Sequence, residues 1–243
     1  MGNAVSHPCK FDEVAVKNPL FHSHRRFVLI LSALYFSLWV ALAVEPTSRE
    51  DWALENIVVL GAVLILSLTW NRYTFSQCSY LLIALFLTLH AIGSHYTYSE
   101  VPYRNWFELF RGQSEESVGT IARNHYDRFV HFTYGLLMYY PYRECFLQIA
   151  RVHWKLWSYL VPLSFILSTS LIYELLEWLA ATVLGGDVGI AFVGSQGDMW
   201  DAQMDCFCAF VGALITSTTL AVTNLVTKRD GASEWIRFSN QGH

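Results

Sequence analysis

The stretch from Leu156 to Leu184, LWSYLVPLSFILSTSLIYELLEWLAATVL, decides the fold, because it is apolar almost throughout and contains neither lysine nor arginine. A transmembrane helix needs about 20 mostly apolar residues. This stretch is therefore long enough to cross a bilayer with a tilt, or to project from it. Its only charged residues, Glu174 and Glu177, lie in its second half. Acids inside a membrane span are rare and usually have a functional role.

The composition of the whole chain agrees with a membrane protein. Charged residues make up 15% of the 243 residues and hydrophobic residues 53%, whereas about a quarter of an ordinary soluble domain is charged. The net charge of −4 is too mild to indicate nucleic acid or another charged polymer as a partner. The five cysteines form no CxxC pair and no zinc spacing, so we interpret them as packing residues.

Six stretches are candidate membrane spans, of which the fourth is the weakest because it is short and aromatic. They are 27–44, 53–70, 80–95, 129–142, 156–184 and 199–226. The first is expected to be a retained helix and not a signal peptide, because no small-residue cleavage site follows it. The sequence therefore predicts an all-α polytopic bundle of about six transmembrane helices over 27–226. The segments 1–26 and 227–243 would be its N-terminal segment and C-terminal tail.

The distribution of lysine and arginine predicts the orientation. If the N-terminus is inside, eleven of the sixteen basic residues fall in inner segments and five in outer segments, and the last outer loop has none. Short inner loops are the ones enriched in lysine and arginine. Both termini are thus expected to be cytoplasmic, in a multi-pass protein of the cell inner (cytoplasmic) membrane.

Acidic and imidazole side chains gather toward the outer end of four of these stretches. Asp198, Asp201 and Asp205 follow an i, i+3, i+7 spacing, which keeps them on one stripe of a helix. At about 1.5 Å per residue, Asp205 lies roughly 10 Å inward of Asp198, too deep to cap the helix. The others are His90 and His95 on the third stretch, His125, Asp127 and His131 around the start of the fourth, and Glu174 and Glu177 on the fifth. We expect these groups to share one outward-facing polar pocket.

Such a pocket needs a source of positive charge, because an ionised acid at bilayer depth costs at least a few kcal/mol. Carboxylates with histidine suit zinc, manganese or iron, and carboxylates alone suit magnesium or calcium. We therefore expect the pocket to bind a divalent cation and to act on a lipid-linked or envelope substrate, with membrane lipids as contacts of the protein. The candidate metal ligands are His95, His131, Glu174 and Asp205. Asp201 and Glu177 are the candidate catalytic or ligand-orienting groups, and Arg128, Asp127, His125 and Asp198 the candidate substrate-binding groups.

Other interpretations stay open at this point. Asp198 follows GSQG and is a natural helix N-cap, and the helix dipole favours Asp201 in the first turn. His95 and His125 would be ordinary interfacial histidines, and His131 would form a salt-linked pair with Asp127. In place of a metal, protonated acids would serve a proton-coupled carrier or small channel, or a membrane partner whose polar residues only lock helix packing. No HExxH, P-loop, GxSxG or Rossmann motif points to a reaction.

Four motifs in order carry a resemblance to a known family. They are GSHYTYSEVPY (93–103), NHYDRFVHFTYGLLMYYPYRE (124–144), YELLEW (173–178) and GSQGDMWDAQMD (194–205). Through them the chain resembles the YjdF-type family of bacterial inner-membrane proteins, whose role is uncharacterised. A more distant similarity is to the VanZ-like family, which is linked to glycopeptide (teicoplanin) resistance. That similarity implies Asp127, His131, Glu174 and Asp201 or Asp205 as motif counterparts, followed by Gly212; this chain has Asp205 where an asparagine is usual there.

Two further features lie outside the predicted spans. The start MGNAVS fits the loose pattern for N-myristoylation, which is not expected in a bacterium, so chance explains it better. The outer connection 100–124 contains Trp106, Phe107, Leu109 and Phe110, which indicates a short interfacial helix over the pocket. A plain surface loop is nearly as well supported.

Overall fold

Apolar runs and helices coincide in the computed structural model, which describes residues 19–70, 73–103, 123–150, 156–184 and 196–241. These residues form helices and connecting turns, with no strand among them. The helices are α2 (Pro19–Leu42), α3 (Arg49–Thr69), α4 (Gln77–His95), α6 (Tyr126–Gln148), α7 (Trp157–Leu184), α9 (Asp201–Thr227) and α10 (Gly231–Gln241). The prediction of an all-helical polytopic bundle is confirmed. The start MGNAVS and the expected interfacial helix, with Trp106, Phe107, Leu109 and Phe110, lie outside the described residues.

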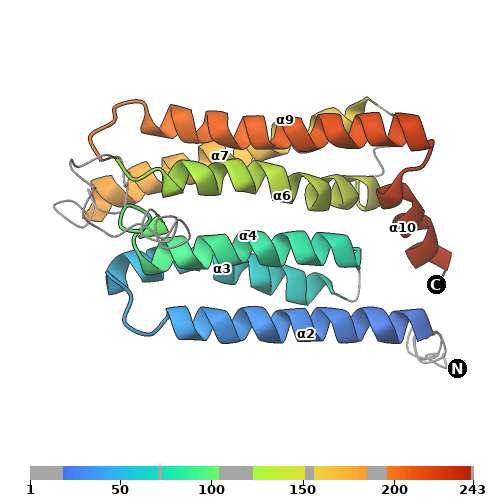
Figure 1. Cartoon of the computed structure of the whole chain (residues 1–243), viewed down its shortest axis with the longest axis horizontal. Helices are drawn as coiled ribbons and strands as arrows, with labels where there is room; N and C mark the ends of the chain where they lie inside the picture. The colour runs from blue at the N-terminus through green and yellow to red at the C-terminus, as the bar shows by residue number, and fades with distance from the viewer. Residues whose placement is uncertain (1–18, 71–72, 104–122, 151–155, 185–195, 242–243) are drawn as a thin grey trace, which may run out of the picture.

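Five of these helices, α2, α3, α4, α7 and α9, are long and apolar enough to cross a membrane. Helix α6 also has 23 residues, but it is rich in tyrosine and carries charged residues at both ends. It lies at the centre of the bundle, in contact with α4, α7, α9 and α10, whereas α2 and α3 pack on the α4 side (Figure 1). Because protein and not lipid surrounds α6, its polar composition is tolerated. The expected span 129–142 was therefore too short at both ends.

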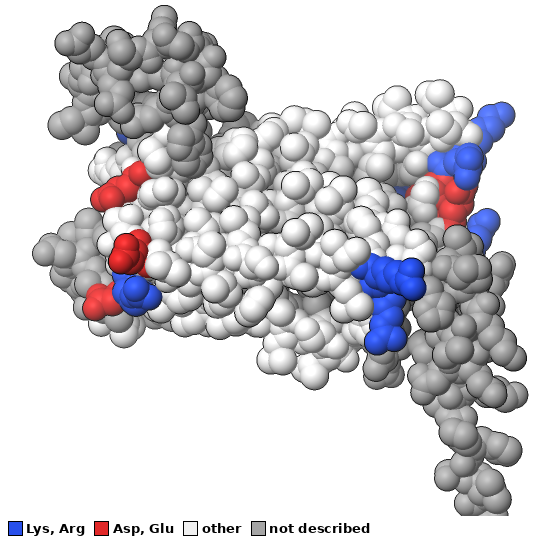
Figure 2. All heavy atoms as spheres, turned by 60° about the horizontal axis from the view of Figure 1, so that its bottom comes forward, with Lys and Arg blue, Asp and Glu red and all other residues white. Residues whose placement is uncertain are grey.

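The bundle has an apolar belt between two charged ends. Figure 2 shows a broad uncharged surface in the middle, with lysine, arginine and acidic side chains at either end. Large apolar side chains of α2, α3 and α7 are exposed on the outside, including Leu34, Leu64 and Trp178, as expected for residues that face lipid. Helix α2 begins and α10 ends at the same end of the bundle (Figure 1), as an even number of crossings requires. The cytoplasmic location of that end stays a prediction.

The tightest helix crossing is that of α6 and α9, where two glycines let the backbones touch. A Cβ on Gly135 would lie 1.9 Å from the carbonyl oxygen of Ala209, and a Cβ on Gly212 would lie 2.1 Å from that of Phe132. Small residues at such crossings allow the close approach that drives helix association in membranes. The crossing brings the first two turns of α6 and α9 side by side, and these turns carry Asp127, Asp201 and Asp205.

A second polar cluster anchors α10 at the other end of the bundle. Arg143 of α6 is 1% exposed, and its two terminal nitrogens donate to both carboxylate oxygens of Asp230, at 2.9 and 2.7 Å. Its guanidinium also lies over the ring of Tyr159. Burial raises the pKa of Asp230, but the hydrogen bonds and charge of Arg143 together with hydrogen bonds from Ser233 leave the net pKa lowered. Next to Arg143, the buried Glu144 accepts hydrogen bonds from Ser76 and Ser79 at the start of α4.

We predict that Arg143→Ala strongly destabilises the protein, because it leaves the Asp230 carboxylate without its partner and empties a packed site. Breaking a buried pair by removing one partner costs about 3–5 kcal/mol, and we expect the lower value here because the side chain of Asp230 is 27% exposed. The melting temperature in detergent measures this loss. Arg229→Ala is the matched control, because Arg229 is 74% exposed in its pair with Glu234, and it should leave the melting temperature unchanged. Equal effects of the two variants would contradict the assignment of Arg143 as the anchor.

Candidate metal centre

Three helices bring an imidazole and carboxylates together at the end of the bundle opposite α10. The Nε2 atom of His131 lies 3.3 Å from Oε1 of Glu174 on α7 and 3.7 Å from Oδ1 of Asp127, one turn earlier on α6. Asp127, His131 and Asp205 each offer one ligand atom within 4.8 Å of the other two. The grouping predicted for His131, Glu174, Asp127 and the α9 acid is therefore present in the structure.

Two carboxylate oxygens of this cluster are buried without a hydrogen-bond partner. They are Oδ1 of Asp205, in a residue that is 1% exposed, and Oε1 of Glu174, in a residue that is 9% exposed. Glu177, one turn further along α7, is buried as well. A buried polar atom without a partner costs about 1–3 kcal/mol, and more when it is charged. The cluster is therefore incomplete as a purely structural feature and calls for a cation or for protons.

The donor set fits a divalent transition metal. Two carboxylates and one imidazole, with a third carboxylate beside them, are ligands that zinc, manganese and iron accept. Metal–ligand bonds of about 2.1 Å place tetrahedral ligand atoms roughly 3.4 Å apart, so the three side chains need only small rotations to close around an ion. Magnesium prefers an all-oxygen shell and fits the set with His131 less well.

Asp198 and Asp201 pair with two arginines from a different part of the sequence. Arg123 contacts Asp201 directly and lies 3.4 Å from Asp198, while Arg128 contacts Asp198 directly and lies 3.5 Å from Asp201. The segment 173–205 contains no lysine or arginine of its own. Its basic partners, Arg123 and Arg128, come from the chain just before α6 and from the first turn of α6. Asp198 and Asp201 thus lie at a rim of alternating charge just outside the cluster. We call Arg123, Arg128, Asp198 and Asp201 the rim.

The loop before α9 holds the rim in place. The side chain of Gln196 bonds both backbone groups of Asn124, accepting from its N–H at 2.8 Å and donating to its carbonyl at 2.9 Å. Asp198 is not the N-cap of α9, which begins one residue after Trp200; instead its Oδ1 accepts from the N–H of Trp200 at 2.9 Å. That bond and the contact with Arg128 lower the pKa of Asp198, so it is ionised at neutral pH.

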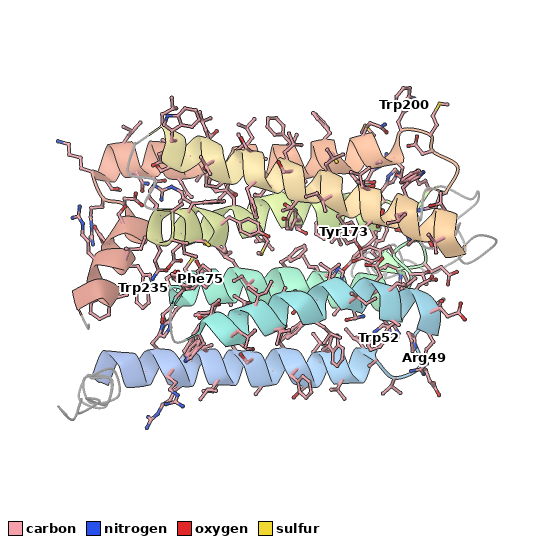
Figure 3. All side chains as sticks on the ribbon, turned by 180° about the vertical axis from the view of Figure 1, so that it is seen from behind. Arg49, Trp52, Phe75, Tyr173, Trp200 and Trp235 are labelled. Atoms are coloured by element: carbon pink, nitrogen blue, oxygen red, sulfur yellow. The ribbon has the colours of Figure 1, made fainter. Side chains whose placement is uncertain are left out.

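Helix α3 contributes an acid that the sequence analysis did not select. Glu55 is buried and accepts a hydrogen bond of 2.5 Å from the hydroxyl of Tyr173. Tyr173 in turn packs edge-on against the ring of His131, with 6.0 Å between centroids. Figure 3 shows Tyr173 pointing from α7 toward α3, near the end that carries Arg49, Trp52 and Trp200. A glutamate inside the apolar stretch 53–70 was the available signal, but its partner is 118 positions away.

His90 and His95 lie on different sides of α4. Nδ1 of the buried His90 is 2.5 Å from the hydroxyl of Tyr98, and its ring packs against those of Phe86 and Tyr98. His95, expected as a metal ligand, is instead hydrogen-bonded through Nδ1 to the carbonyl of Leu42, at 2.7 Å. That bond ties the end of α4 to the end of α2. His95 is not a member of the group formed by Asp127, His131 and Asp205.

His125 also lies apart from the buried cluster. It occupies the N-cap position of α6 without a side-chain capping bond, and its residue is exposed. The interpretation of His125 as an interfacial histidine is thus in accord with its place, while its substrate-binding role stays a prediction.

Comparison with known proteins agrees with this architecture. Residues 27–225 match the family described as "Predicted membrane protein (DUF2238)". This chain belongs to that family. Inner membrane protein YjdF of Escherichia coli (strain K12) is 35% identical over 196 residues, which cover 79% of this chain and 90% of that protein. No solved structure matches the chain.

Membership of the DUF2238 family confirms the YjdF-type resemblance and the multi-pass membrane character of the chain. A relative that is an inner membrane protein agrees with the expected location in the inner membrane. The VanZ-like similarity stays a prediction. The family description and the name of the relative give a place in the cell but no reaction, so the chemistry has to be inferred from the cluster itself.

Proposed function

We propose that this DUF2238 protein binds one divalent transition-metal ion through Asp127, His131 and Asp205, with Glu174 as a fourth ligand. The observation that carries the proposal is that two buried carboxylate oxygens beside the His131 ring, Oδ1 of Asp205 and Oε1 of Glu174, accept no hydrogen bond. An ion bound there would remove the repulsion among the acids and would polarise water or an oxygen of a bound substrate.

The position of the cluster favours a substrate that reaches it from the membrane or its surface. The cluster lies inside one end of the apolar belt, beneath a rim that contains two arginines. Arginine binds carboxylate and phosphate groups with paired, directed N–H donors. We therefore extend the proposal to a lipid-linked or envelope substrate with an anionic group. Asp201 and Glu177 would orient ligands or accept a proton, although Asp201 is also paired with Arg123.

Metal analysis of the purified protein tests the proposal. The full chain, stripped with a chelator, is titrated with zinc, manganese, iron and magnesium by calorimetry, and its metal content is measured. We expect one transition-metal ion per chain and at least a 100-fold weaker affinity in His131→Ala and Asp205→Asn, since even supporting residues of metal sites are worth 10- to 100-fold. His125→Ala is the matched control and should bind normally. A wild-type protein without stoichiometric metal, or a His131→Ala variant that retains it, would refute the site.

Proton-coupled transport is the second candidate, and one observation favours it. Glu55 and Glu177 are buried carboxyl groups outside the metal-binding group, and Glu55 shares a hydrogen bond with Tyr173 beside His131. Such groups form proton pathways in membrane proteins. Proton uptake into liposomes containing the protein, lost in Glu55→Gln, is the expected result for this candidate. No proton movement above that of empty liposomes would exclude it.

A further inference from the structure

We propose that Arg123 and Arg128 form a phosphate-binding subsite next to the metal centre, and that Asp198 occupies this subsite when no substrate is bound. The proposal deepens the function proposed above and rests on it. The shared chemistry of the ligand is a phosphate group, carried either by a lipid headgroup or by free phosphate. The carboxylate of Asp198 would act as an internal substitute for that group.

The arrangement of the two arginines carries the first step of the argument. They come from the same short segment and converge on the same two carboxylates, so that each guanidinium contacts both Asp198 and Asp201. Two guanidinium groups this close repel each other unless anionic oxygens lie between them. Planar N–H donors that already share carboxylate oxygens have the geometry to share the oxygens of a phosphate.

A spare donor supports the same conclusion. The Nε atom of Arg128 is buried and has no hydrogen-bond partner, although its terminal nitrogen binds Asp198. A carboxylate on Arg128 therefore leaves one N–H of the fork unused. A phosphate offers three or four oxygens and could satisfy both edges of the guanidinium, which a single aspartate does not.

Asp198 and Asp201 differ in a way that makes Asp198 the exchangeable group. The side chain of Asp201 is 9% exposed and begins α9, whereas that of Asp198 is 29% exposed and lies in the loop before the helix. Gly197, immediately before it, has φ +85°, a backbone conformation that a side chain would disfavour. Turning Asp198 out to water gives up its contacts with the two arginines and its bond from the N–H of Trp200; a bound phosphate would replace the arginine contacts, while Asp201 remains to orient Arg123.

The subsite is adjacent to the metal centre by chain connectivity. Arg128 follows the candidate ligand Asp127 directly on α6, and Asp201 precedes the candidate ligand Asp205 by one turn on α9. A phosphate held by the two arginines would therefore present an oxygen toward the cation. A cation and arginines acting together on one phosphoryl group are a recurring means of stabilising its charge.

Phosphate binding to the full chain in detergent tests the proposal. Calorimetry with inorganic phosphate is carried out in EDTA, so that its outcome does not depend on the metal. We expect Asp198→Asn to bind phosphate roughly tenfold more tightly than the wild type, because an internal competitor is removed, and Arg128→Gln to lose binding. A gain of affinity cannot arise from misfolding, so Asp198→Asn keeps the test valid if Arg128→Gln fails to fold. Unchanged affinity in Asp198→Asn would overturn the proposal.

Two additional experiments identify the source of the phosphate and test the phosphate subsite separately from the metal centre. Dodecyl phosphate that binds more tightly than inorganic phosphate indicates a lipid headgroup, and equal affinities indicate free phosphate; dodecyl maltoside is the uncharged control. His131→Ala should keep phosphate binding in EDTA while it loses metal. If metal binding fails in the wild type but phosphate binding follows Asp198 and Arg128, only the metal centre is refuted. If metal binds and phosphate does not, only the subsite is refuted.

Discussion

Gly212→Ala should prevent the bundle from forming its central crossing. The added methyl group would lie 2.1 Å from the carbonyl oxygen of Phe132 and 2.8 Å from the backbone nitrogen of Leu136. Both are backbone atoms of α6, so no side-chain rotation relieves the overlap and the two helices must move apart. Overpacking of a core typically costs about 1–3 kcal/mol and occasionally more; we expect at least the upper value here. The melting temperature in detergent and the monodisperse fraction on gel filtration measure the effect.

The matched control is the same substitution at a glycine with open surroundings. Nothing lies within 4 Å of a Cβ placed on Gly61 of α3, and alanine is the better helix former. Gly61→Ala should leave the melting temperature unchanged or slightly raised, and Gly135→Ala should resemble Gly212→Ala. If Gly212→Ala behaved like Gly61→Ala, the backbone contact between α6 and α9 would be wrong, and the grouping of Asp127 with Asp205 would lose its support.

The second large effect concerns the stability of Asp205→Asn relative to the wild type. We expect this variant to be more stable than the wild type without metal and less stable when metal is bound. Without metal, Asp205→Asn should stabilise the protein, by about 1 kcal/mol, because an amide does not repel the neighbouring acids Asp127 and Glu174 as an ionised Asp205 does. With metal, the wild type should gain about 4 kcal/mol at a free ion concentration 1,000 times the dissociation constant, and Asp205→Asn should gain almost nothing. Thermal unfolding in EDTA and across a zinc or manganese titration shows whether the two stability curves cross.

Ser217→Ala separates this effect from general destabilisation of α9. Ser217 lies further along the same helix, is buried, and accepts a hydrogen bond from the hydroxyl of Tyr139. Its loss should lower the melting temperature by a similar amount with and without metal. Equal metal-dependent gains in the wild type and in Asp205→Asn would contradict the assignment of Asp205 as a ligand, whatever the sign of the effect in EDTA.

Hydropathy predicted the helices well wherever a helix faces lipid. The stretch 156–184 contains all of α7. Helices α2, α3, α4 and α9 overlap their predicted spans, and most of their ends lie within a few residues of the predicted ends. For α6 it predicted only the middle part, 129–142, because the first turn carries Asp127 and the end near α10 carries Arg143 and Glu144. These residues are stable in α6 because neighbouring helices and not lipid surround it, and a hydropathy pattern does not include neighbours.

Spacing along single helices predicted part of the cluster, but pairings between helices were missed. Asp127 and His131 share a face because they are one turn apart, and the structure keeps them together. Glu55 was not selected, since Tyr173, its partner, is brought to it only by folding. His95 was selected for its depth, yet its ring turns toward the end of α2. Depth in the membrane restricts a residue to a layer and leaves its direction around the helix undetermined.

The sequence by itself determined that this chain is a helical membrane protein with acids and histidines concentrated toward one end of its spans. Hydropathy and helical periodicity are local quantities, so they can be read from neighbouring residues. Only the tertiary structure decided that Arg123 and Arg128 pair with Asp198 and Asp201, while Asp205 and Glu174 keep buried oxygens that accept no hydrogen bond. That division depends on the approach of α6 and α9 at Gly135 and Gly212, because ångström-scale distances between residues far apart in sequence decide which charges compensate one another.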